Sequence, residues 1–152
     1  MSDHPSPAHA TSPVLTTESI SDSLLDALDE QQLDELARRI STRRFARVEV
    51  QLLAALRADS AALHRDGLTD HPEPVTHITF STHDNDYDPV CWDLNAVTRH
   101  ESGAKTPVDY SGTDVEGVLR DYSSFTSPVA GSRLVVDLST GQFTVRGAWE
   151  PA

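Results

Sequence analysis

A long stretch without glycine or proline constrains this chain more than any other feature of its sequence. Residues 14–66 contain neither residue type, although the chain has seven Gly and nine Pro. Because these two residues disfavour a helix interior most strongly, their absence over this length predicts helices. We expect a helical arm over residues 18–66. Residues 1–17, rich in Pro, Ser and Thr, are expected to form a disordered tail.

Capping residues divide the expected arm into three helices. Ser19 or Ser21 can cap a short first helix that continues to Leu28, because a side-chain oxygen there accepts a hydrogen bond from a free helix N–H. Asp29 can cap a second helix in the same way, and the Ser41–Thr42 pair offers a cap for a third.

The third expected helix, from about Arg43 to Asp66, carries an apolar stripe. Its members recur at spacings of three, four and seven residues, as side chains on one helix face do: Phe45, Val48, Leu52, Leu56 and Leu63. Gly67 follows at the position of a C-terminal cap. A short helical arm with almost no aromatic residues does not easily make its own core. The arm must therefore pack on itself as a hairpin, dock on the sheet domain or associate with another chain. Of these, a homodimer through the stripe from Phe45 to Leu63 is the favoured expectation.

A change of period separates the arm from the rest of the chain. Residues 67–74, GLTDHPEP, read as a linker, and after Pro74 apolar residues alternate with a period of two. The expected fold class is α+β: after the helical arm, an antiparallel sheet with one helix packed on one face. Its elements in residues 75–152 are a three-strand meander (75–82, 89–97 and 106–111), a helix with a Thr113/Glu116 capping box (113–125) and a β-hairpin (133–147).

The charge of the chain limits its partners. The formal net charge is −12, and residues 67–152 carry thirteen acidic and five basic residues. Such a surface repels phosphate backbones and anionic membranes at long range, so a basic protein is the favoured partner. Eleven of the twelve basic residues are Arg, which suggests a bacterium or phage. One cysteine, no signal peptide and no long apolar segment predict a cytoplasmic protein.

The stretch HDNDYDPVCWDLN, residues 83–95, raises the question of calcium binding. Asp84, Asp86 and Asp88 match the first three ligand positions of an EF-hand loop. Pro89 stands where the loop requires glycine, and Asn95 stands where it requires a bidentate glutamate. The three aspartates are therefore expected to form the acidic tip of a β-hairpin, where they are candidates for binding a partner.

Four residues nearby are the candidates for a transition-metal site or a small active site. His77, His83, Cys91 and Asp93 are expected on one face of two neighbouring strands. His, Cys and Asp are metal ligands, and a histidine beside a cysteine can also activate the thiol as a nucleophile. Their spacing matches no established metal motif.

An arginine cluster is the strongest local charge feature. Five arginines lie between residues 38 and 47, and Arg43, Arg44 and Arg47 are candidates for partner binding. Arginines that open the second helix of a helix-turn-helix can read DNA, which makes DNA binding one alternative function. The absence of a glycine in the turn and the negative net charge do not favour it.

These observations favour binding over catalysis. We expect a small acidic protein–protein interaction module, of the inhibitor or immunity kind, that binds a basic partner without a cofactor. A metal-binding protein or small enzyme that uses the four-residue face is the first alternative, and DNA binding through residues 38–47 is the second.

Overall fold

The computed structural model describes residues 22–67, 71–85 and 88–147. The chain divides into two compact units, residues 1–40 and 41–152, and each is considered by itself. This division differs from the expected one at residues 67–74. The expected tail, residues 1–17, and the expected caps Ser19 and Ser21 lie outside the described residues.

The first unit contains α1 (Asp22–Asp26) and the beginning of α2 (Glu30–Arg65). Asp29 caps α2 as predicted: its Oδ1 accepts the Gln32 amide at 2.8 Å, and the Asp29 amide donates to Gln32 Oε1 at 3.0 Å. This reciprocal pair satisfies two backbone donors that the first helical turn leaves free. One turn later Glu35 forms ion pairs with both Arg38 and Arg39.

The predicted break at Ser41–Thr42 is wrong, because α2 continues through these residues to Arg65. Serine and threonine are good caps, but inside a sequence without Gly or Pro nothing forces the backbone out of the helical conformation. Gly67 follows the helix with φ +65°, as its predicted role as a C-terminal stop requires.

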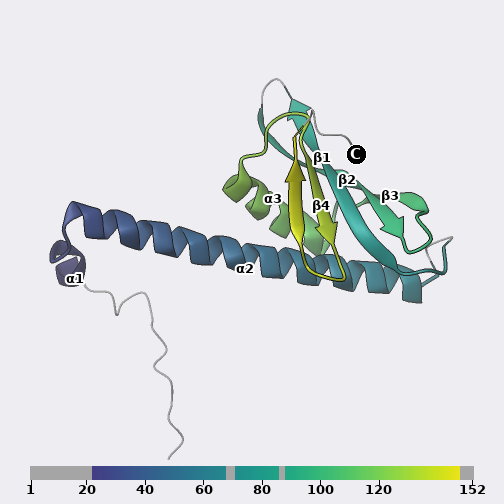
Figure 1. Cartoon of the computed structure of the whole chain (residues 1–152), viewed down its shortest axis with the longest axis horizontal. Helices are drawn as coiled ribbons and strands as arrows, with labels where there is room; N and C mark the ends of the chain where they lie inside the picture. The colour runs from purple at the N-terminus through teal and green to yellow at the C-terminus, as the bar shows by residue number, and fades with distance from the viewer. Residues whose placement is uncertain (1–21, 68–70, 86–87, 148–152) are drawn as a thin grey trace, which may run out of the picture. The chain divides into compact units, whose positions relative to one another are not determined.

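The second unit is built on one antiparallel sheet, which confirms the predicted α+β class (Figure 1). The strand order is β3-β2-β1-β4-β5, so the C-terminal hairpin extends the N-terminal meander through the β1–β4 pair. The β3 and β5 strands form the two edges. The strand bounds are Val75–Asn85 (β1), Asp88–His100 (β2), Lys105–Asp109 (β3), Arg133–Asp137 (β4) and Phe143–Arg146 (β5).

The helix α3 (Asp114–Thr126) joins the meander to the hairpin, and Thr113 is its N-cap. Thr113 Oγ1 accepts the Val115 amide at 3.3 Å, while Glu116 Oε2 accepts the Gly112 amide at 2.8 Å. Both contacts satisfy free backbone donors at the helix start, which explains why the helix begins here. The predicted capping box is therefore formed only in part, because a full box would pair Glu116 with the Thr113 amide, which donates to the Tyr110 carbonyl instead.

Both α3 and residues 41–65 of α2 cover the same face of the sheet. Val48, Leu52 and Leu56, from the stripe that was expected to form a homodimer, are buried in the core of this unit. Since these side chains are covered by the chain itself, a homodimer would need another surface. The other core residues come from the sheet, the β3–α3 segment and α3: Ile78, Phe80, Trp92, Ala96, Tyr110, Val115, Leu119, Tyr122, Leu134, Val136 and Leu138.

Aromatic and polar contacts fix α2 against its neighbours. The Phe45 ring stacks on Tyr122 of α3, with ring centroids 5.6 Å apart. Burial, with a smaller effect from the charge of Glu49, raises the pKa of Tyr122 to about 12, so its hydroxyl stays protonated at neutral pH. Near the β4–β5 turn, the Arg57 guanidinium donates to the Leu138 carbonyl at 2.6 and 2.8 Å. The helix is therefore held at two separate places.

Trp92 connects the sheet to the end of α3. Its amide donates to Ser123 Oγ, and its indole Nε1 donates to Thr126 Oγ1, both at 3.1 Å. The β1–β2 register is irregular between Phe80 and Thr82, next to this point. A backbone amide that leaves the regular ladder still needs an acceptor, and the Ser123 side chain supplies it.

The docking of α2 on the sheet predicts a clear difference between two neighbouring positions. Leu52 is fully buried, whereas Val50 is 69% exposed on the same helix. Leu52→Ala should lower the free energy of unfolding by about 3 kcal/mol, because it leaves a cavity in the core. Val50→Ala should change it by less than about 0.5 kcal/mol. Urea denaturation of both variants measures the difference, and equal effects would contradict the docking.

Candidate functional site

The acidic hairpin tip is only partly described. The β1–β2 hairpin turns between the paired residues Asn85 and Asp88, at the predicted place. Asp86 and the side chains of Asp84 and Asp88 lie outside the described part of the chain. Partner binding by these three aspartates remains a prediction.

The four candidate metal ligands are not gathered at one point. His83 pairs across the strands with Cys91, and its Nδ1 lies 3.8 Å from Asp93 Oδ2. His77 is six residues earlier on the same strand, roughly 20 Å away at the usual rise of an extended chain. Within the described ranges, no group of three or more His, Cys, Asp or Glu residues is arranged to hold a metal ion.

The candidate arginines belong to the continuous helix α2. The Arg44 guanidinium lies over the Phe125 ring of α3, 5.7 Å from its centroid. Arg47 borders the same depression as Arg44 and Asp121, while Arg43 is exposed. Because α2 has no turn near residue 41, the helix-turn-helix geometry on which the DNA-binding alternative depends is absent.

The sheet face opposite the helices carries an unexpected concentration of positive charge. Arg99 stands directly across from Lys105 on β2 and β3, and Arg133 stands directly across from Arg146 on β4 and β5. These are four of the five basic residues in 67–152, a region with thirteen acidic residues. All four line a depression of about 610 Å³, here called the open sheet face, together with His77, Thr79, Ser81, Asn95, Val97, Val135, Asp137, Gln142 and Thr144.

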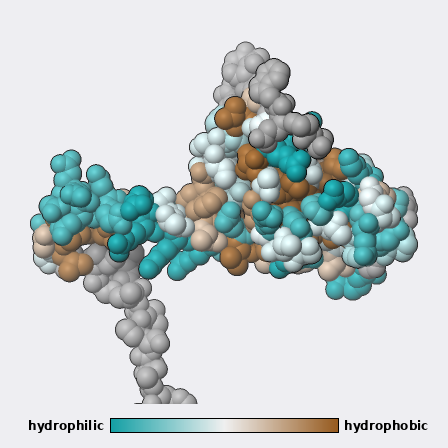
Figure 2. All heavy atoms as spheres, in the orientation of Figure 1, coloured by the Kyte–Doolittle hydropathy of each residue, from teal (hydrophilic) through white to brown (hydrophobic). Residues whose placement is uncertain are grey.

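Apolar side chains separate the two basic pairs. Val97 is paired with Thr79, and Thr79 with Val135, so that these residues form the middle row of the open sheet face. Val97 is 41% exposed. Figure 2 shows one side of the molecule, on which hydrophobic residues lie as separate patches between hydrophilic ones.

A polar network crosses three strands at one end of this face. The Arg99 guanidinium donates to His77 Nδ1 at 2.8 Å. Since an arginine has no acceptor, the imidazole carries its proton on Nε2, which lies 3.7 Å from Asp137 Oδ2. Asp137 Oδ1 accepts the Ser139 hydroxyl at 2.6 Å and the amides of Ser139 and Thr140 at 2.8 and 3.1 Å. These hydrogen bonds, the Ser139 hydroxyl first, hold the pKa of the Asp137 carboxyl well below its usual range.

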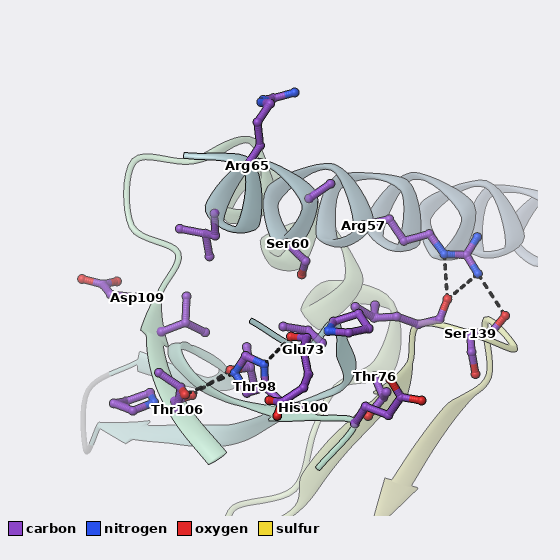
Figure 3. Close-up of a pocket in the computed structure, with 18 residues that line it drawn as sticks. Arg57, Ser60, Arg65, Glu73, Thr76, Thr98, His100, Thr106, Asp109 and Ser139 are labelled. Carbon is purple, nitrogen blue, oxygen red and sulfur yellow. Dashed lines mark hydrogen bonds between the residues drawn. The ribbon is translucent and has the colours of Figure 1, made fainter. Parts of the chain in front are cut away.

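A second hollow, the α2–sheet cavity, lies between the last turns of α2 and strands β1, β2 and β3 (Figure 3). Its volume is about 810 Å³, and most of its lining is apolar. This size is within the range of small-molecule sites. Leu63 and Ala61 line it from the helix, and Val75, Pro107 and Val108 line it from the strands.

The cavity follows from one interruption of the apolar stripe. Ser60 occupies the position four residues after Leu56, where another large side chain would reach the sheet. Its side chain points into the cavity, and its buried Oγ has no hydrogen-bond partner (Figure 3). The spacing of seven residues between Leu56 and Leu63 in the apolar stripe is the sequence signal for this gap.

The floor of the cavity is polar, and its polar side chains form hydrogen bonds with other groups of the protein. His100 is buried, and its Nδ1 donates to the Glu73 carbonyl at 3.0 Å while its Nε2 lies 3.3 Å from Thr106 Oγ1. Thr98, also buried, donates from Oγ1 to the Thr106 carbonyl at 3.0 Å. These groups need no further partner, in contrast to Ser60.

Comparison of the chain with protein-family models, curated proteins and solved structures finds no match. None of the helices in the described ranges is long and apolar enough to cross a membrane.

The Asp137 network predicts a pH dependence of stability. Because the pKa of Asp137 is lower in the folded protein than in the unfolded chain, its contribution is complete above the ordinary aspartate pKa near 4 and declines as the pH falls below it. Asp137→Asn should therefore lower the free energy of unfolding at pH 7. The difference from wild type should shrink between pH 4 and pH 2.

Urea denaturation across this pH range measures the effect. Asp121→Asn, on the exposed side of α3, is the matched control for loss of one negative charge. A constant difference between wild type and Asp137→Asn from pH 7 to pH 2 would contradict the assignment.

Proposed function

We propose that this protein is a protein–protein interaction module that binds an acidic segment of its partner on the open sheet face. The observation that carries the proposal is the pair of like-charged contacts, Arg99 across from Lys105 and Arg133 across from Arg146. Like charges directly opposite each other destabilise a sheet, and neither pair is needed for the core. A carboxylate placed between each pair would remove this repulsion.

The spacing of the two pairs suggests the shape of the partner segment. With about 4.8 Å between strands and about 3.4 Å between residues, Arg99 and Arg133 are roughly 17 Å apart at their Cα atoms, and Lys105 and Arg146 roughly 23 Å. An extended segment of about six residues spans this distance. The segment would carry acidic residues at both ends and apolar residues between them, opposite Val97 and Val135.

The proposal changes the partner expected from net charge alone. A net charge of −12 favours a basic partner at long range. At contact distance the local charges dominate, because charges further away than about 8 Å are largely screened at physiological salt. A nucleic acid is a less suitable partner, because its phosphates would extend beyond the open sheet face and lie against the negatively charged surface around it.

Reversal of one charge tests this proposal. Arg146→Glu places opposite charges across from each other at Arg133, so stability should stay equal or rise by about 0.2–1 kcal/mol. The same change should remove partner binding, because it takes away one of the two basic pairs. A photo-cross-linking amino acid at Thr79, in the middle of the face, reports binding in the native host.

Wild-type protein should give a cross-link to one protein, identified by mass spectrometry, and Arg146→Glu should lose it. Arg65→Glu, in the exposed last turn of α2, is the control and should keep the cross-link. If Arg146→Glu keeps the cross-link, if Arg65→Glu loses it, or if the cross-linked species is a nucleic acid, the proposal is wrong.

A further inference from the structure

We propose that the α2–sheet cavity binds a small neutral molecule with a mostly apolar body and a single hydrogen-bonding group. This site is separate from the open sheet face and does not depend on the function proposed for it. Four observations carry the inference: the volume, the lining, an unpaired buried hydroxyl, and the orientation of the nearby arginines.

The volume and the lining select the body of the ligand. A cavity of about 810 Å³ is larger than a packing defect of a folded domain, and it is open to solvent on one side. The walls are formed by aliphatic side chains, including Leu63, Val75 and Val108. An apolar body gains free energy when it leaves water for such a surface.

Ser60 selects the polar group of the ligand. Its Oγ is buried without a partner on the helix side of the cavity. A buried hydroxyl without a hydrogen bond costs stability, and a serine in a helix interior costs more than alanine. A ligand with one hydroxyl, carbonyl or amine group would satisfy Ser60 Oγ while its body fills the space below.

The charged residues around the cavity disfavour an anionic ligand. Three acidic residues, Glu73, Glu101 and Asp109, belong to its lining. Arg57 lies at the cavity edge, where its guanidinium donates to the carbonyls of Leu138 and Ser139. The Arg65 side chain extends away from the cavity (Figure 3). No cation of the lining is directed into the interior, so a carboxylate or phosphate would be buried without a counter-charge, which is costly.

Binding of a fluorescent probe tests the cavity in the full-length protein. N-phenyl-1-naphthylamine is neutral, apolar and carries one N–H group, and its fluorescence should rise on binding with one-to-one saturation. 1-Octanol should displace it, and octanoate should compete at least tenfold more weakly. No saturable binding, or stronger competition by octanoate, would overturn the proposal.

Cavity-filling substitutions locate the binding site. Ala61→Trp fills the cavity from the helix and Val108→Phe fills it from the strand side, and either should weaken probe binding more than tenfold. Ala54→Trp, an exposed position on the same helix, is the matched control and should bind the probe like wild type. Unchanged binding in both filling variants would place the probe elsewhere and overturn the proposal.

The Ser60→Ala substitution distinguishes an effect on ligand binding from an effect on the stability of the fold. It removes an unpaired hydroxyl and improves helix propensity, so the melting temperature should stay equal or rise. The affinity for 1-octanol should nevertheless fall roughly three- to tenfold, because the ligand loses one hydrogen bond. Unchanged octanol affinity would overturn the role of Ser60.

Other occupants have distinct signatures in the same experiments. Nuclear Overhauser contacts in the ligand-free protein between Val14 or Leu15 and lining residues would assign the cavity to the chain's own N-terminal segment. Probe binding that weakens as protein concentration rises would assign it to a second copy. Either result would overturn the small-molecule proposal.

Discussion

The burial of one stripe of α2 on the sheet is the contact on which the second unit depends. The sheet presents an apolar face too wide for the thirteen-residue helix α3 alone, and Val48, Leu52 and Leu56 complete its cover. Full burial of each such side chain contributes about 1.5–3 kcal/mol, which is a large part of the stability of a small domain. A division of the chain at residues 67–74 would separate the sheet from the helix that covers it.

The local elements of the second unit were predictable, because each has a strong short-range signal. The period of two in 75–82, the N-cap at Thr113 and the stop at Gly67 all appear where the sequence placed them. What covers each apolar face was not predictable. The stripe from Phe45 to Leu56 is equally suited to a second copy and to the chain's own sheet, since periodicity shows which residues must be buried and not against what. The break expected at Ser41–Thr42 failed because capping residues permit a helix end without requiring one.

The candidate site illustrates the same limit. The four basic residues of the open sheet face are far apart in sequence, and only the strand order brings Arg133 and Arg146 into the same surface as Arg99 and Lys105. The net charge of residues 67–152 is negative and therefore gives no indication that one face of the sheet carries four basic residues. The cavity, in contrast, is indicated by the sequence of one helix, because Ser60 stands where the apolar stripe would place a large side chain. In both places the chain accepts an unfavourable local arrangement, repulsion between like charges in one and an unpaired hydroxyl in the other. Such local conflicts are expected where selection for binding outweighs selection for stability.

The two edges of the sheet bear on how this protein can assemble. β3 contains Pro107, which has no amide hydrogen to offer a further strand, and β5 is only four residues long and ends at the charged, exposed Arg146. Proline, shortness and charge are the features by which exposed edges avoid pairing with strands of other molecules. Continuous sheets between copies of this chain are therefore disfavoured at both edges. A partner that approaches the sheet finds side chains on its broad face and little free backbone at its borders, so its recognition would depend on side-chain identity.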